Sequence, residues 1–385
     1  MRVLLVAPFY PPEVTGSSNF VADLAQGLTE AGHSVCVVTA SPDARSDTFP
    51  VVRLPARRVS PGRIAFGYSI PVVLGRRNLR LIRKTLDEFA PDVVACHGQI
   101  FDITIITALM ARRRGVPTVM TVHSAIWHDN PFLNAILAAG DLILAKLFLT
   151  RAVSSWIGVD NRTTEHTRAR YSSTVRSIPV CLRRGRFVAG DAARAGERYG
   201  LAGRPRIVSI GHVVPVRNRV ALVEALPHLL SDHPDLELVV VGRVADDEFI
   251  QRATDLGVSG HVKVVGQVPH DEIPDLLAAS DMEVHDLQGY GLGIGSLEPI
   301  DAGLPIVAFV REDNLPGVDL RRVCPEGFLP DNHPMTIATA VSRILTDPEC
   351  RTRVVSQQKS LLEEIYYVDV VTAKYVEEFT RLLSD

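Results

Sequence analysis

The segment that decides the fold is Gly291-Leu-Gly-Ile-Gly-Ser-Leu-Glu298-Pro-Ile-Asp-Ala-Gly303-Leu-Pro-Ile-Val307, in the second half of the chain. Its glycines at 291, 293 and 295 precede an expected helix, so the backbone N–H groups at the helix start are unhindered and favour an anion. The apolar residues after Gly303 predict a buried strand. Glu298 lies near the first turn of the helix. Its carboxylate either accepts two hydrogen bonds from a ribose diol or serves only as a charge that the helix dipole favours.

On both sides of this segment, short β-branched runs alternate with helical stretches. The runs lie at residues 3–7, 34–39, 93–96 and 118–122 in the first half and at 206–211, 236–241, 262–265, 282–285 and 305–309 in the second. Continuous apolar strands separated by helices predict parallel sheets that are covered on both faces. We therefore predict an α/β chain of two Rossmann-like, doubly wound halves that face a central cleft, with ligands outside the carboxyl ends of the strands.

Composition excludes several classes of protein. The chain has 385 residues, of which 46% are hydrophobic and 22% charged, and this is typical of a globular protein of two domains. Its net charge of −3 disfavours general nucleic-acid binding. The five cysteines are widely spaced and form no metal-ligand motif, which indicates buried thiols in a reducing compartment.

Two apolar stretches resemble export or membrane signals in their composition. The N-terminal run is too short for a signal peptide and is broken by prolines, so it predicts a buried strand. The stretch from Phe132 to Thr150 is interrupted by Asn134, Asp141 and Lys146, which argues against a membrane-spanning helix. We therefore expect a cytoplasmic protein.

The order of several motifs is similar to that of one enzyme family. The chain opens with Met1-Arg-Val-Leu-Leu-Val-Ala-Pro-Phe-Tyr-Pro-Pro-Glu-Val-Thr-Gly16 and continues with Val93-Val-Ala-Cys-His97-Gly98, Thr121-Val-His123, Ile178-Pro179, Gly266-Gln-Val-Pro-His270 and the glycine-rich segment. With these motifs the chain resembles the retaining glycosyltransferases of the GT-B fold, family 4 (glycosyl transferases group 1). The resemblance spans nearly the whole chain. It implies transfer of a sugar from a nucleoside diphosphate sugar to an acceptor, with retention of anomeric configuration and with no metal or other cofactor.

The resemblance also implies a division of labour between the domains. The first domain, residues 1–182, would bind the acceptor, and the second, residues 206–360, would bind the nucleotide sugar. The intervening segment 183–205, rich in Arg, Gly and Ala, is predicted to be a linker. The C-terminal residues 361–385 are predicted to form a helix that packs back on the N-terminal domain.

Most donor-binding residues follow from the same resemblance. Glu298 would hold the nucleotide ribose, and the backbone of four residues before it would contact the sugar and the phosphates: Gly293, Ile294, Gly295 and Ser296. In the opening loop, Gly16 indicates either an anion-binding turn at a helix start or a plain turn from strand to helix. The family's Gly-Arg-x-x-x-x-Lys loop corresponds to the segment from Gly211 to Arg217, and Arg217 at the Lys position can clamp a phosphate bidentately.

Two positions depart from the family pattern. His212 replaces the arginine of the phosphate loop, and imidazole is only partly charged near neutral pH, so pyrophosphate binding is expected to be weaker. Arg219 either compensates or is an exposed arginine at a helix start. Tyr290 replaces the first acid of the family's Glu-x7-Glu motif. This predicts an unusual donor, a substitute contact from Asp286 or Gln288, or loss of activity.

His123 is the predicted catalytic residue. By the resemblance it lies beside the transferred sugar, where it would stabilise developing positive charge or bind a sugar hydroxyl. For His97, the sequence gives equal support to a functional role and to a structural role. No pair of carboxylates with glycosidase spacing and no acidic metal motif is evident. Catalysis would then depend on positioning and on stabilising the departing diphosphate.

One stretch is biased in charge. Residues 53–84 carry nine basic side chains and no acidic one. Arg76, Arg77, Arg80 and Arg83 fall on an expected amphipathic helix, which either is solvated or makes peripheral contact with an anionic membrane at its inner face. The apolar segment 132–149 is expected to be a buried core helix, with shallow membrane insertion as the alternative. The acceptor is accordingly either a membrane lipid or a soluble aglycone or saccharide.

Two rival functions remain open. A catalytically silent GT-B binding or regulatory subunit is suggested by His212 and Tyr290, which replace two expected polar anchors. A sugar-nucleotide epimerase of the same fold ranks last, because its acidic and histidine pattern is not found in the chain.

Overall fold

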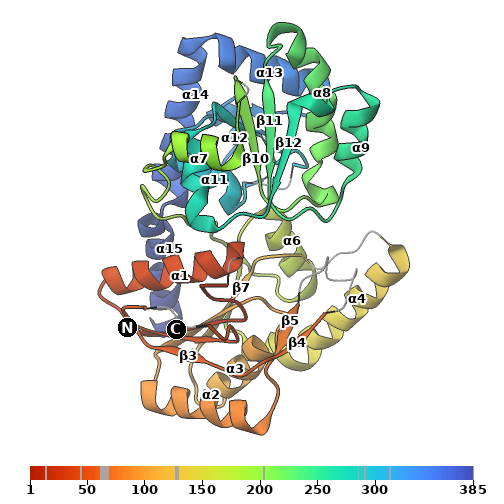
Figure 1. The fold of residues 1–385 in the computed structure, drawn as a ribbon. Helices are drawn as coiled ribbons and strands as arrows, with labels where there is room; N and C mark the ends of the chain where they lie inside the picture. Colours follow the sequence, from red (N-terminus) through yellow and green to blue (C-terminus); the bar gives the residue numbers. More distant parts are fainter. Residues whose placement is uncertain are drawn as a thin grey trace. The chain divides into compact units, whose positions relative to one another are not determined.

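The computed structural model describes residues 1–13, 15–43, 46–60, 69–125, 130–202, 204–284, 286–289, 292–311 and 314–384. The chain forms two compact units (Figure 1). The first unit consists of Met1–Cys181 and Val368–Asp385, and the second of Leu182–Tyr367. The last helix of the chain, α15 (Val368–Ser384), therefore belongs to the N-terminal unit.

The first unit is built on a parallel sheet of seven strands in the order β3-β2-β1-β6-β7-β8-β9. These strands are β1 (Arg2–Ala7), β2 (Ser34–Thr39), β3 (Val51–Arg53), β6 (Val93–His97), β7 (Thr118–Val122), β8 (Ser155–Gly158) and β9 (Arg176–Ser177). A separate antiparallel hairpin joins β4 (Arg57–Val59) to β5 (Ile70–Val72). The helices are α1 (Gly16–Glu30), α2 (Arg76–Phe89), α3 (Asp102–Arg112), α4 (Pro131–Leu144), η2 (Ala145–Leu149), α5 (Thr150–Ala152), α6 (Asn161–Arg170) and α15.

The strand order explains the predicted double winding. From β1 the chain moves to β2 on one side, whereas from β6 it moves to β7 and β8 on the other side. Right-handed crossovers therefore place α1 and α3 on opposite faces of the sheet. Helix α15 packs on α1, where Gly27 lets it approach: a Cβ added at Gly27 would lie 2.4 Å from Oγ1 of Thr372. The sheet reverses between β1 and β6, and such switch points bind ligands in open α/β sheets.

The second unit repeats this plan with a parallel sheet of six strands in the order β12-β11-β10-β13-β14-β15. They are β10 (Arg206–Ile210), β11 (Glu237–Val241), β12 (Val262–Gly266), β13 (Met282–Val284), β14 (Ile306–Phe309) and β15 (Phe328–Leu329). The helices are α7 (Ala192–Tyr199), η3 (Pro215–Arg217), α8 (Arg219–Asp232), α9 (Glu248–Asp255), η4 (Ser259–His261), η5 (His270–Glu272), α10 (Ile273–Ala278), α11 (Ile294–Asp301), α12 (Leu320–Val323), α13 (Pro334–Thr346), α14 (Pro348–Leu361) and η6 (Leu362–Tyr366). Its switch point lies between β10 and β13.

Two predictions about the segments around the second unit need correction. The predicted linker 183–205 contains helix α7, which is part of the second unit and packs on α10. The packing is close, because a Cβ added at Gly190 would lie 1.9 Å from the carbonyl oxygen of Pro274. The predicted C-terminal helix does not run from residue 361: the chain bends at Tyr367, and α15 begins at Val368.

The apolar segment after β7 differs most from its prediction. Helices α4, η2 and α5 form one rod from Pro131 to Ala152, which by length and composition alone could cross a membrane, yet only 12% of its most apolar stretch is buried. The prediction of a buried core helix is therefore wrong. The polar residues that interrupt this segment in the sequence do not all interrupt its exposed surface, because Asp141 is buried within the unit.

Candidate functional site

The loops at the switch point of the second unit bring most predicted donor-binding residues together. The loop after β10 runs from Gly211 through η3 to Asn218, whose side chain accepts a hydrogen bond from the backbone of α8. Backbones approach closely here, since a Cβ added at Gly242 would lie 2.1 Å from the carbonyl oxygen of Gly211. Because β10 and β13 are paired, this loop faces the segment that leads from β13 to α11.

Arg217 is held at the start of α11. Its guanidinium forms an ion pair with Asp286, which also accepts a hydrogen bond from the hydroxyl of Ser296. A Cβ added at Gly293 would lie 3.6 Å from Nη2 of Arg217, so Gly293 is in immediate contact with the guanidinium. The predicted residues Arg217, Gly293 and Ser296 therefore form one cluster, and Asp286 connects them.

The first turn of α11 completes an anion-binding arrangement. Gly293 is the N-cap, and no side chain caps the helix. The backbone N–H groups of Ser296 and Leu297 are bonded to the carbonyl of Gly293, whereas those of Ile294 and Gly295 lie before the first intrahelical bonds. A guanidinium and the start of a helix both attract a negative group. The cluster can therefore bind a phosphate.

Glu298 lies one turn further along α11 and is 5% exposed. Nε2 of His270 donates a hydrogen bond to Oε1 of Glu298 over 2.9 Å. The ring of His270 packs edge-on against Phe187, with 5.6 Å between the ring centroids. His270 therefore fixes the position of the Glu298 carboxylate. The interpretation of Glu298 as only a charge at the helix start does not account for this hydrogen bond. His270 belongs to the motif Gly266-Gln-Val-Pro-His270, but its sequence separation from Glu298 does not indicate the contact.

Buried charges lie behind the phosphate loop. Arg219 is 3% exposed, so the interpretation as an exposed arginine at a helix start is wrong. Burial, and then the positive charge of Arg217, lowers its pKa, while the carboxylate of Glu283 on β13 acts in the opposite direction. Burial in turn raises the pKa of Glu283. Arg217 and Arg219 therefore add their positive potentials at the end of β10.

His212 makes a different contribution from the arginine that it replaces. Burial, followed by the charges of Arg243 and Arg217, lowers the pKa of His212. The imidazole is therefore neutral at pH 7 and can form hydrogen bonds but adds no charge. The expectation of weaker pyrophosphate binding at this position remains a prediction.

The position of the missing acid can be described only from its neighbours. Tyr290 and Gly291 lie outside the described residues. Asp286 and Gln288, the two residues that could replace the missing acid, both bind the loop after β10. Asp286 forms an ion pair with Arg217, and Nε2 of Gln288 donates a hydrogen bond to the carbonyl oxygen of Pro215. Glu283 is a functional candidate that the sequence did not indicate, and Asp286 is one that it indicated only as an alternative. Glu283 lies within β13 and Asp286 two residues after it, and this position near the carboxyl end of a strand was the available signal.

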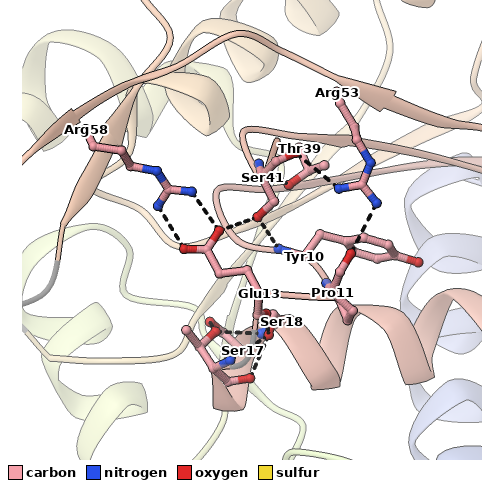
Figure 2. Close-up of polar contacts among 10 residues, drawn as sticks. Tyr10, Pro11, Glu13, Ser17, Ser18, Thr39, Ser41, Arg53 and Arg58 are labelled. Carbon is pink, nitrogen blue, oxygen red and sulfur yellow. Dashed lines mark hydrogen bonds and ion pairs between the residues drawn. The ribbon is translucent and has the colours of Figure 1, made fainter. Parts of the chain in front are cut away.

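In the first unit, a polar network fixes the loop between β1 and α1 (Figure 2). Glu13 accepts two hydrogen bonds from Arg58, at 2.7 and 2.8 Å, and one from the hydroxyl of Ser41, at 2.6 Å. Arg53 donates to the carbonyl oxygens of Ser41 and Pro11. These contacts therefore hold Pro11 and Glu13, in the described part of the loop before α1.

Gly16 itself has space around it. Apart from its two chain neighbours and the adjoining backbone of α1, no described residue has an atom within 4 Å of a Cβ built on Gly16, so a ligand could approach its backbone. The side chain of Thr15 caps α1 by accepting a hydrogen bond from the backbone of Ser18, and the hydroxyl of Ser18 receives the backbone N–H of Thr15. This capping box stabilises the turn by itself, so the structure is consistent with both interpretations of Gly16.

The two histidines form a pair at the ends of β6 and β7. Nδ1 of His97 lies 3.1 Å from Nε2 of His123, a hydrogen bond in which one ring donates and the other accepts. Phe20 of α1 contacts both rings edge-on, at centroid distances of 5.6 and 5.1 Å. Nε2 of His97 is buried and has no hydrogen-bond partner among the described residues. His97 therefore positions the ring of His123, which is a role intermediate between the two that the sequence left open.

Burial also sets the charge of this pair. It lowers the pKa of His123 to about 4 and, together with the neighbouring His123, lowers the pKa of His97 well below its usual value. Both rings are neutral at pH 7. A neutral imidazole can accept a hydrogen bond from a sugar hydroxyl or face a developing positive charge without repelling it.

We expect the first unit to lose stability as the pH falls from 6.5 towards 4. In this window the unfolded chain binds a proton at His123 and the folded chain does not, so acidification favours unfolding. The loss from His123 alone is about 3 kcal/mol. Urea denaturation at pH 7 and at pH 4 measures it, and His123→Asn should flatten the dependence by that amount. An equally steep dependence in the variant would contradict the lowered pKa.

Two family models match the chain. The model described as "Glycosyl transferase 4-like domain" matches residues 15–158, and the model described as "Glycosyl transferases group 1" matches residues 197–360. The first match lies in the N-terminal unit and includes Gly16 and His123. The second lies in the other unit and includes His212, Arg217 and Glu298.

Two of the relatives are mannosyltransferases of Mycolicibacterium smegmatis. The chain is 34% identical over 200 residues to the GDP-mannose-dependent alpha-(1-6)-phosphatidylinositol monomannoside mannosyltransferase of Mycolicibacterium smegmatis, covering 48% of this chain and 52% of that enzyme. It is 26% identical over 394 residues to the phosphatidyl-myo-inositol mannosyltransferase of the same organism, covering 98% of this chain and 93% of that enzyme. The match thus spans about half of the first relative and nearly all of the second.

Solved structures agree in fold. Anabaena HepE in complex with UDP and glucose superposes with a TM-score of 0.71 at 15% identity and covers 99% of both chains. WaaG, a glycosyltransferase involved in lipopolysaccharide biosynthesis, has a TM-score of 0.63 at 17% identity, covering 98% of this chain and 99% of that one. At these identities the likeness concerns the fold alone.

Proposed function

Because the chain belongs to the group 1 glycosyl transferases of family 4 and has the GT-B fold, we propose that it transfers a hexose, with retention of configuration, from GDP-mannose to a phosphatidylinositol-type lipid. Support for the donor and the acceptor comes from the mannosyltransferases that it resembles, which are named for GDP-mannose and for phosphatidylinositol. Support for retention comes from the motif pattern of the family.

The observation that carries the proposal is the cluster at the start of α11. Arg217, the unbonded N–H groups of Ile294 and Gly295, and the buried Arg219 behind them would neutralise the donor diphosphate. Glu298, oriented by His270, would accept hydrogen bonds from the ribose hydroxyls. No group of three His, Cys, Asp or Glu side chains suited to a metal ion occurs among the described residues, and we propose that these cationic and backbone groups bind the diphosphate directly.

His123 is the proposed catalytic residue. In the transfer, the bond from the sugar C1 to the diphosphate oxygen breaks, the acceptor hydroxyl oxygen bonds to C1, and its proton passes to the departing diphosphate. Neutral His123 would stabilise the positive charge that develops on the sugar, or hold a sugar hydroxyl, and His97 would fix its ring. Such preorganised groups act by electrostatic stabilisation of the transition state.

A donor and acceptor assay tests the proposed function. GDP-mannose and UDP-glucose are compared by thermal shift, and mannose transfer to phosphatidylinositol in detergent micelles is followed by the mass of the product. A ligand at 100 times its dissociation constant stabilises the protein by about 2.7 kcal/mol. We expect GDP-mannose to stabilise the protein and to be consumed. Binding without transfer or hydrolysis would support the silent-subunit alternative instead.

We also propose that α2 makes peripheral contact with anionic membrane. The side chains of Arg76, Arg77, Arg80 and Arg83 are exposed, whereas Asn78, Ile82, Thr85 and Leu86 are buried against the unit. The helix is therefore amphipathic, as predicted, with a basic outer face. Anionic lipid attracts each basic side chain near its surface by about 1 kcal/mol.

Changing the four arginines to glutamine should weaken binding to anionic vesicles at low salt by at least about 100-fold. Co-sedimentation with vesicles containing phosphatidylinositol measures the effect, and wild-type binding should itself weaken as salt rises. The matched control changes four exposed arginines of the second unit, Arg198, Arg204, Arg322 and Arg353, and so removes the same charge. Equal losses in both variants would indicate non-specific attraction and contradict the role of α2.

A further inference from the structure

The rod from Pro131 to Ala152, whose first part is the helix labelled α4 in Figure 1, carries a stripe of exposed apolar side chains. Phe132, Ile136, Ile143 and Leu147 have exposed fractions of 73%, 53%, 57% and 65%. Their spacings of four and seven residues place them on one face of a helix. Ala135, Ala139 and Gly140 are exposed between them. Among the side chains that the structure describes from Pro131 to Phe148, none of the exposed ones is charged.

The opposite face of the rod is anchored to the rest of the unit. Asp141 is 3% exposed and forms an ion pair with Arg170 at 3.0 Å. It also accepts a hydrogen bond from the hydroxyl of Tyr171. Leu149 and Ala152 are buried in the core of the unit. These contacts fix the rotation of the rod. The stripe faces outwards because the buried Asp141 holds the opposite face against the unit.

Large apolar side chains that gather on an exposed protein surface mark an interaction site. The neighbouring elements identify the occupant. Helix α3 packs against α2 and also against η2 and α5, so the basic helix and the apolar rod share α3 as a common neighbour. A surface that presents arginines beside exposed Ile, Leu and Phe is complementary to the anionic headgroups and the acyl chains of a bilayer.

The connections of the rod exclude a spanning orientation. A helix of 22 residues is about 33 Å long, which is enough to cross the hydrocarbon core. However, the rod joins β7 to β8, which are adjacent, paired strands of one sheet. Both of its ends therefore return to the same side of any membrane.

We propose that the rod Pro131–Ala152 lies in the boundary between headgroups and acyl chains, with the stripe formed by Phe132, Ile136, Ile143 and Leu147 inserted. This proposal deepens and rests on the proposed function, because a lipid acceptor is what requires the enzyme to work at a bilayer. Basic α2 supplies the salt-sensitive part of binding, and the stripe supplies a part that salt does not weaken.

The first test separates these two parts. In Ile136→Gln, Ile143→Gln and Leu147→Gln combined, the fraction of protein bound to phosphatidylinositol-containing vesicles at 1 M salt should fall at least about tenfold. The matched control changes three exposed apolar residues of the second unit, Val188→Gln, Ile250→Gln and Met335→Gln, and should bind like the wild type. Unchanged binding by the first variant, with an unchanged melting temperature, overturns the proposal.

The second test reads insertion directly. All five native cysteines are buried, so Ile136→Cys provides an accessible thiol for an environment-sensitive dye, and Met335→Cys provides the control position. We expect a blue shift and quenching by shallow spin-labelled lipids at residue 136 only. A dye at 136 that stays aqueous while the protein sediments with vesicles overturns the proposal, as does a blue shift without vesicles that accompanies dimer formation.

The two proposals can fail independently. Insertion without any sugar transfer to lipid would leave the membrane surface intact and refute the proposed activity. Transfer to phosphatidylinositol in micelles, with no insertion into vesicles, would support the activity and refute the role of the rod.

Discussion

Arg217→Ala should lower the affinity for GDP by about 10–100-fold while leaving the affinity for guanosine nearly unchanged. The difference arises because the guanidinium would bind the diphosphate and not the nucleoside, and a hydrogen bond to a charged group contributes about 1.5–3 kcal/mol. The variant should also melt at a lower temperature, because Asp286 is 7% exposed and loses the cation with which it forms an ion pair. Isothermal titration with both ligands measures the first effect and calorimetry the second.

The control for this experiment is Arg252→Ala. Arg252 also forms an ion pair, with Glu224 at 2.8 Å, but this pair lies on the surface of α8 and α9. Its loss should change neither affinity and should cost at most about 1 kcal/mol of stability. If Arg217→Ala weakens guanosine and GDP equally, the residue does not contact the phosphates and the anion site at α11 is wrongly assigned.

His123→Ala should lower turnover by about 10²–10³-fold with little change in donor affinity, if the ring acts on charge that is present only in the transition state. Removal of the ring also takes away the hydrogen-bond partner of Nδ1 of His97. His97→Gln should therefore have a smaller effect in the same direction, since it disturbs the orientation of His123 without removing it. Single-turnover kinetics and equilibrium binding of GDP-mannose separate the two quantities.

The matched control is His228→Asn, which removes an exposed histidine of α8 and should leave turnover unchanged. Because His123 packs against Phe20, His123→Ala could simply unfold the first unit, so its melting temperature is measured with its activity. A variant that melts far below the wild type but turns over normally at low temperature would make His123 structural. An equal fall in donor affinity and turnover would place His123 in ground-state binding.

The sequence by itself determined the architecture. Runs such as Val93–Cys96, apolar throughout, predict strands buried on both faces, and β6 is buried along its whole length. The glycines before α11 and the amphipathic pattern of α2 are local signals, because each depends on residues within one element. Arg217, Gly293 and Ser296 were predicted from the family resemblance rather than from a local pattern; the structure brings them together, and their role in donor binding stays a prediction. The basic outer face of α2 is confirmed.

Only the tertiary structure decided which of these residues meet and which charges are buried. Arg217 pairs with Asp286, His97 with His123, and Glu298 with His270, across separations of 69, 26 and 28 residues that no local pattern reports. Burial of Arg219 depends on the neighbouring strand β13, which carries Glu283. The apolar rod was misassigned for a related reason. Hydrophobicity predicts only that a face avoids water. Whether the apolar face of the rod is packed in the core or exposed depends on which side the buried Asp141 turns inwards.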